Sequence, residues 1–86
     1  MKCYRLYISW LDEKAIKIIG DLREILNNEV EGDFYLEIID ILKSPDQIAD
    51  EDEIMATPTL VKSFPPPRRK AIGYIADKNA LLKLFA

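Results

Sequence analysis

The chain has 86 residues, of which 49% are hydrophobic and 31% charged, with a net charge of −3 and a pI near 4.9, so we expect a single domain over residues 1–86. The negative charge argues against general nucleic-acid binding, while the absence of histidine and the single cysteine favour a protein without metal, cofactor or internal disulfide. No apolar run approaches the roughly 20 residues of a membrane span, and no secretion or lipidation signal is evident, so we expect a cytoplasmic protein that does not bind membranes.

The first half of the sequence predicts a strand, a helix and a second strand. Apolar residues alternate with others over Cys3–Trp10, which is typical of a strand. Asp12 is placed to cap a helix whose apolar residues, from Ala15 to Ile25, recur at the spacing of one helical face. The β-branched run Phe34–Ile41 then predicts a strand covered on both faces. Together these elements indicate a βαβ unit with parallel strands.

The second half predicts a short helix, two strands and a last helix. Ser44 followed by Pro45 is a helix-start signal, and that helix extends to about Asp50. A third strand over Thr59–Phe64 and a fourth over Arg68–Ile75 should pair antiparallel, because only the stiff Pro65–Pro67 segment joins them. Asp77 caps the last helix. The expected order is βαβαββα, an α/β fold with a mixed four-stranded sheet.

A threonine-proline pair entering the third strand of this order resembles the thioredoxin fold, in which the proline is usually cis. The redox dithiol of that fold follows the first strand, where this chain has the cysteine-free stretch Ser9–Glu13. Cys3 lies at the opposite end of the strand, so the dithiol chemistry lacks its thiols. A thiol-dependent redox protein using Cys3 stays as the alternative function.

Three motifs in order carry a more specific resemblance. They are Ile39–Pro45, Ala56–Leu60, and Pro65–Arg69 followed by Ile72-Gly73. Over about Tyr4–Leu82 the chain resembles the KaiB family of circadian-clock proteins, which is related to the sensor domain of the clock kinase SasA. The resemblance implies a non-enzymatic protein that binds a KaiC-type ATPase ring, in circadian or related signalling.

The resemblance also implies fold switching. The family has a tetrameric ground state with a rearranged C-terminal half and a monomeric, thioredoxin-like state that binds KaiC, and such packings lie within a few kcal/mol of each other. Here Leu84 and Phe85 stand where the family usually carries a glycine-containing stretch that helps the ground state. We therefore expect the thioredoxin-like form, which a helix over Pro65–Arg69 would contradict. Whether the protein is a monomer, dimer or tetramer stays open.

The residues expected to contact the partner come partly from the family and partly from a basic cluster. They are Lys43, Thr57, Pro58, Lys62, Arg68 and Arg69. Structural roles are expected for Pro58, as a cis-proline, and for Gly73. The basic cluster, which also includes Lys70, can equally be the charged protection of an edge strand.

Other features have simpler interpretations than a functional one. The prolines Pro65–Pro67 favour a stiff turn over an SH3 ligand. The acidic stretch Asp50–Glu53 lacks the glycine and ligand spacing of a calcium loop and indicates a solvated turn. Trp10 is either an exposed anchor or, more often in such a position, a residue packed under the helix. A sensor domain separated from its kinase is a third functional alternative.

Overall fold

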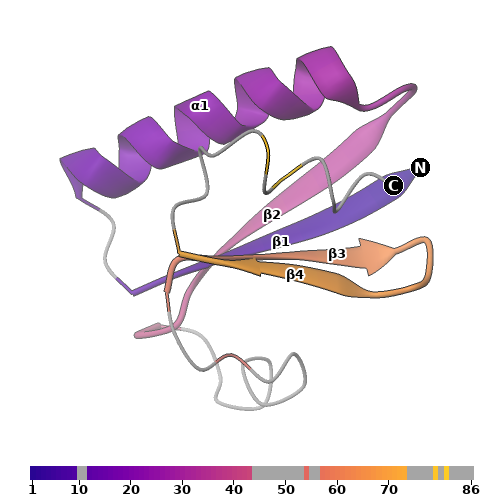
Figure 1. The fold of residues 1–86 in the computed structure, drawn as a ribbon. Coiled ribbons are helices and arrows are strands. Elements are labelled where there is room, and N and C mark those ends of the chain that lie inside the picture. Colours follow the sequence, from indigo (N-terminus) through magenta and orange to yellow (C-terminus); the bar gives the residue numbers. More distant parts are fainter. Residues whose placement is uncertain (10–11, 44–53, 55–56, 74–78, 80, 82–86) are drawn as a thin grey trace.

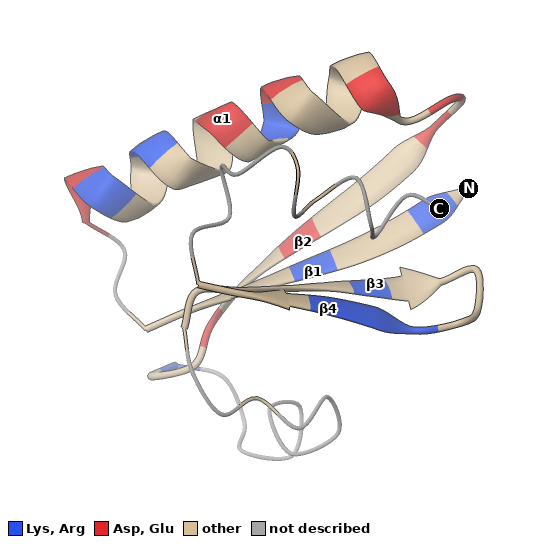
Figure 2. Ribbon diagram, viewed as in Figure 1, with Lys and Arg blue, Asp and Glu red and all other residues tan. Residues whose placement is uncertain are grey.

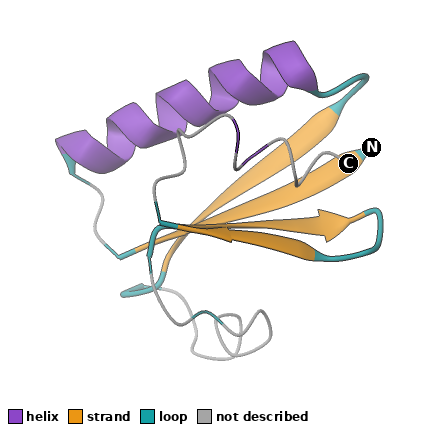
Figure 3. Cartoon of the chain, in the orientation of Figure 1, coloured by secondary structure: helices purple, strands orange, loops and turns teal. Residues whose placement is uncertain are grey.

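One helix lies across a four-stranded sheet in the computed structural model, which describes residues 1–9, 12–43, 54, 57–73, 79 and 81 (Figure 1). The elements are β1 (Lys2–Ile8), α1 (Glu13–Glu29), β2 (Phe34–Asp40), β3 (Thr59–Phe64) and β4 (Arg69–Ile72). The strand order is β2-β1-β3-β4. This is a mixed α/β arrangement of thioredoxin-like type, with β2 and β4 at the two edges (Figure 3).

The predicted βαβ unit is confirmed. Strands β1 and β2 pair in parallel, with Lys2 opposite Phe34 and Ile8 opposite Asp40. Asp12 is the N-cap of α1, and its Oδ1 accepts a hydrogen bond of 2.9 Å from the backbone amide of Ala15. This bond satisfies one of the amides that a helix start leaves without an intrahelical partner. The first strand ends at Ile8, two residues before its predicted end at Trp10, which lies outside the described residues.

Strands β3 and β4 form the predicted antiparallel hairpin, with Thr59 opposite Ile72 and Lys62 opposite Arg69. The prolines 65–67 make its turn and contain no helix, so the chain has the thioredoxin-like form rather than the rearranged one. Strand β4 is shorter than predicted. It ends before Gly73, whose φ of 99° is a backbone conformation that residues with a Cβ rarely adopt.

The main core lies between α1 and the sheet. The apolar residues predicted for the inner face of the helix all belong to it. They meet alternate residues of three strands, and the fully buried members include Tyr4, Leu6, Leu22, Leu26 and Leu60. Burial of these side chains supplies most of the driving force for folding, at roughly 25 cal/mol per Å² of apolar surface.

The opposite face of the sheet, here called the open face, is only partly covered. At one end, Tyr7, Ile39 and Val61 form a small buried cluster against Ile41 and Ile54. At the other end, Tyr35 of β2 is 56% exposed. The prediction that this second strand is covered on both faces is therefore wrong for its first half, because no described helix or strand packs on the open face at Tyr35.

Both remaining predicted helices fall largely outside the described residues. The short helix predicted over residues 44–50 and the acidic stretch 50–53 are not described, nor is most of the last helix. Leu81, predicted for the buried side of that last helix, is helical and fully buried in the main core. None of the described helical residues forms a segment long and apolar enough to cross a membrane.

Alkaline pH should destabilise the protein through Tyr4. Burial raises the pKa of its phenol above the usual value of 10.0. Above pH 10 the unfolded chain therefore loses this proton more readily than the folded protein, so stability falls as the pH rises through the folded-state pKa. We expect the free energy of unfolding, measured with urea between about pH 9 and pH 11, to fall less steeply with pH for Tyr4→Phe than for the wild type. Equal dependence of this free energy on pH in the two proteins would show that Tyr4 is not the group responsible.

Candidate partner-binding surface

Three of the residues expected to contact a partner lie on segments that meet at one end of the strands, where β1 and β2 finish and β3 begins. The amide of Ile41 donates to the carbonyl of Ile8 at 2.8 Å, which holds the chain leaving β2 beside the end of β1. The hydroxyl of Thr57 donates to Oγ of Ser9 at 3.0 Å, which holds the entry to β3 against the same end. We call this end of the sheet the Ser9 end and define it by Ser9, Leu42, Lys43, Thr57 and Pro58.

A tight turn presents Lys43 at the Ser9 end. The Asp40 carboxylate accepts a 2.9 Å hydrogen bond from the amide of Leu42, and the Asp40 carbonyl accepts one of 3.0 Å from the amide of Lys43. The turn leaves Lys43 exposed and Leu42 65% exposed. Leu42 was missed by the sequence reasoning. An aspartate often starts a turn by accepting a hydrogen bond from the amide of the second residue after it. Asp40 could therefore have indicated that Leu42 lies outside the strand.

The Ser9 end also contains a small hollow where the thioredoxin fold would carry its dithiol. Its walls come from the end of β1, the start of α1 and the Thr57-Pro58 pair, and its volume is about 200 Å³. This is below the roughly 300–1,000 Å³ of typical small-molecule pockets. The Thr57–Pro58 bond is cis, in agreement with the expectation, and the Pro58 carbonyl accepts a 3.0 Å hydrogen bond from Gly73.

No thiol reaches this hollow. The single cysteine, Cys3, lies six residues before Ser9 in the chain, which along a strand is about 20 Å. Among the described residues, no three acidic or cysteine side chains gather into a metal-binding group. The described side chains of the Ser9 end are a cation, an exposed leucine, two hydroxyls and a proline.

The predicted basic cluster does not form a single surface. Lys62 is only 4% exposed, because its pairing with Tyr4 places it on the face covered by α1, so it offers little surface to a partner in this form of the chain and its partner contact stays a prediction. Arg68 and Arg69 are exposed, but they follow the proline turn at the end of the sheet opposite Lys43. Figure 2 shows that the charged positions of β1, β3 and β4 are Lys or Arg and those of β2 are acidic, whereas α1 carries residues of both signs.

The charges on β4 also agree with the alternative interpretation of the basic cluster, in which they protect an edge strand. Strand β4 is an edge of the sheet and carries the exposed Arg69 and Lys70, as expected for a strand protected from pairing with another sheet.

The hydroxyl pair at the Ser9 end should contribute measurably to stability. Thr57→Val removes the donor of its bond to Ser9 while keeping the shape of the side chain, and we expect a loss of about 1 kcal/mol in the free energy of unfolding. In a double-mutant cycle with Ser9→Ala, the second substitution should then cost little. Full additivity of the two losses would show that the bond contributes nothing.

Comparison with known proteins places these features in a family. The sequence profile of the KaiB domain matches residues 5–85. The circadian clock oscillator protein KaiB of Prochlorococcus marinus strain MIT 9312 is 45% identical over 78 residues, which cover 91% of this chain and 73% of that protein. The protein of the same name from Nostoc punctiforme is also 45% identical, with 91% and 74% covered.

Solved structures agree on the fold. The N-terminal domain of Synechococcus elongatus SasA superposes with a TM-score of 0.79 at 21% identity, covering 95% of this chain and 78% of that one. Mitochondrial thioredoxin 3 from Saccharomyces cerevisiae gives a TM-score of 0.72 at 26% identity, with 98% and 76% covered. At these identities the similarity supports the thioredoxin-like arrangement of the strands and helix.

Proposed function

Because the chain belongs to the KaiB family, we propose that it is a non-enzymatic clock regulator that binds a KaiC-type ATPase ring. We propose that binding uses the Ser9 end of the sheet. The observation that carries the proposal is the turn fixed by Asp40, which holds an exposed cation, Lys43, next to an exposed leucine, Leu42. An apolar anchor beside a charge is a common pattern in protein interfaces.

The position of the hollow at the Ser9 end supports a binding role over a catalytic one. In an enzyme of this fold the reactive group would stand at the start of α1, facing Pro58. This chain has the hydroxyls of Ser9 and Thr57 bonded to each other at 3.0 Å, and neither a histidine nor a second cysteine to activate them. These features disfavour the alternative of a thiol-dependent redox protein that uses Cys3.

Arg68 and Arg69 are assigned a secondary part in the same association. Their place at the far end of the sheet from Lys43, about 20 Å along β1, makes them suited to long-range attraction of an acidic ring surface. Charges at the rim of an interface mainly raise the association rate, and their effect decreases with salt.

We further propose that the C-terminal half can repack, with the thioredoxin-like form as the one that binds the ring. Residues 57–73 would then leave the sheet in the other form, so the ring would select one of two states and shift their populations. Because the rearranged form is the tetrameric one in the family, ring binding and self-association would oppose each other.

Size-exclusion chromatography with light scattering tests the proposal. The chain is mixed with a purified KaiC-type ring in the presence of ATP or of ADP, and its elution is compared with that of yeast thioredoxin 3 as a control of similar fold. We expect co-elution of this chain, and not of the thioredoxin, under at least one nucleotide. Separate elution with both nucleotides, from a chain that is folded and monomeric, would overturn the proposal.

A further inference from the structure

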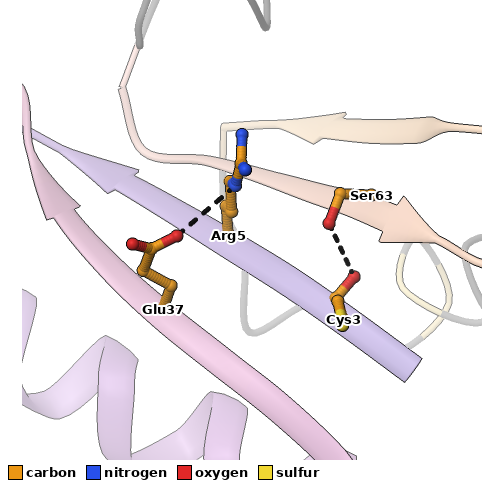
Figure 4. A network of polar contacts seen from close by, with 4 residues as sticks. All are labelled: Cys3, Arg5, Glu37 and Ser63. Atoms are coloured by element: carbon orange, nitrogen blue, oxygen red, sulfur yellow. Dashed lines mark hydrogen bonds and ion pairs between the residues drawn. The ribbon is translucent and has the colours of Figure 1, made fainter. Parts of the chain in front are cut away.

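The half of the open face farthest from the Ser9 end contains a second hollow. Its volume is about 340 Å³, and Cys3 of β1 lines it, opposite Tyr35 of β2 and Phe64 of β3. Figure 4 shows four of the residues around it, with Glu37 on β2, Cys3 and Arg5 on β1, and Ser63 on β3. We call this feature the Cys3 hollow.

A β-bulge shapes the Cys3 hollow. Pairing between β1 and β3 shifts by one residue between Cys3 and Tyr4, so Ser63 is an extra residue on β3. The Ser63 hydroxyl donates to the carbonyl of Cys3 at 3.3 Å, which fixes the irregular segment. A bulge of this kind turns the strand and re-aims its side chains, and here it brings Phe64 opposite Cys3 on the open face.

Two exposed aromatic residues line the Cys3 hollow. Tyr35 and Phe64 are each paired with Cys3, one from either neighbouring strand, and they are 56% and 52% exposed. Neighbouring strands are about 4.8 Å apart, so these two residues are separated by about 10 Å. Two aromatic side chains this exposed on one sheet face give a partner apolar surface to bury there.

Among the described strand and turn positions around the Cys3 hollow, cations outnumber acidic residues, although the protein as a whole is negative. Arg68 lines the hollow, and the alternation of β4 places Lys70 on the same face, opposite Val61. Glu37 is the acidic residue among the described strand positions of this face, and it pairs with Arg5 at 3.4 Å. Strands β1, β3 and β4 contain no aspartate or glutamate.

We propose that the Cys3 hollow binds an acidic peptide segment of a partner protein that carries apolar side chains between its carboxylates. Tyr35 and Phe64 receive the apolar side chains, while Arg68 and Lys70 attract the carboxylates. An acidic peptide suits this face because its carboxylates are complementary to the cations of β4 and the proline turn, and its apolar side chains would cover the two exposed aromatic residues. The Cys3 hollow lies at the opposite end of the sheet from Lys43, so a peptide bound there leaves the Ser9 end accessible to the ring, and Arg68 is the residue that takes part in both associations.

Nuclear magnetic resonance on the full chain tests this inference. The probe is a short glutamate-rich peptide containing one phenylalanine and one leucine. We expect it to shift the amide signals of residues 3–5, 35–37, 63, 64 and 68, and to leave those of residues 40–43 unchanged. Arg68→Glu and Phe64→Ser should each weaken binding about tenfold. Lys17→Glu and Ile16→Ser, which make the same kinds of change on exposed positions of α1, should leave it unchanged.

Several results would overturn the inference. Binding of the matched glutamine-rich peptide with equal affinity would remove the role of charge, and stronger binding of an oligouridine RNA at the same residues would identify a different partner. Shifts confined to the Ser9 end would place the peptide on the ring contact instead. Absence of any shift in the folded protein would also contradict it. None of these outcomes depends on whether the chain binds a KaiC-type ring.

Discussion

Leu22→Ala is expected to lower the free energy of unfolding by about 2–5 kcal/mol. Leu22 is fully buried at the middle of α1, in the core that the helix forms with β1, β2 and β3. The substitution removes this contact and leaves a cavity that the rigid sheet cannot fill. Because domains of this size are stable by only about 5–15 kcal/mol, the variant should be partly unfolded near physiological temperature. Urea unfolding followed by circular dichroism measures the loss.

The matched control is Ile16→Ala on the same helix. Ile16 is 59% exposed on the side of α1 that faces away from the sheet, so its truncation should change stability by less than about 0.5 kcal/mol. If both variants lost similar stability, α1 would not be oriented on the sheet as described.

Lys43→Glu is expected to weaken binding to a KaiC-type ring about tenfold or more, which corresponds to about 1.4 kcal/mol. The side chain is exposed on the turn after β2, so its charge reversal should not disturb the fold. The effect should decrease at high salt, because salt screens charges near the rim of an interface. Fluorescence anisotropy of the labelled chain against the ring measures the change.

The control for this charge reversal is Lys17→Glu, which changes the same charge on an exposed position of α1. It should bind the ring as the wild type does. Equal weakening by both variants would show that only the net charge of the chain matters, and no weakening by Lys43→Glu would remove the Ser9 end as the contact.

Local sequence signals predicted the described elements well where one physical rule dominated. Asp12 as a helix cap and the inner face of α1 follow from hydrogen bonding and helical periodicity, and both are present. The bounds of β3, Thr59–Phe64, were also predicted correctly, since a proline precedes the strand and another follows it. The ends of β1 and β4 were overextended, because alternation continues in the sequence after the pairing partner has ended.

Properties that depend on which faces other elements cover could not be predicted in this way. The apolar run of β2 reads the same whether one face or both faces of the strand are covered, so the exposure of Tyr35 appears only in the structure. Lys62 is a similar case. Its alternation with Leu60 could have indicated a place on the covered face, but the nearby cations in the sequence suggested a shared surface.

The candidate site was predicted in its family-derived part and not in its apolar part. Lys43, Thr57 and Pro58 were named from motifs, and the structure brings the segments that carry them to one end of the sheet. Leu42 was missed, because in the sequence it continues the apolar run of the strand. Leu42 is exposed because the turn begins after Asp40, one residue before the predicted strand end at Ile41.

Hydrogen exchange measured by mass spectrometry on the chain, alone and bound to a KaiC-type ring, tests the central claim most directly. Docking through the Ser9 end predicts slower exchange in peptides covering residues 41–43 and 57–60. It predicts unchanged exchange in those covering residues 34–36 and 63–66, at the Cys3 hollow. Protection of the Cys3 hollow with residues 41–43 unprotected would contradict the claim.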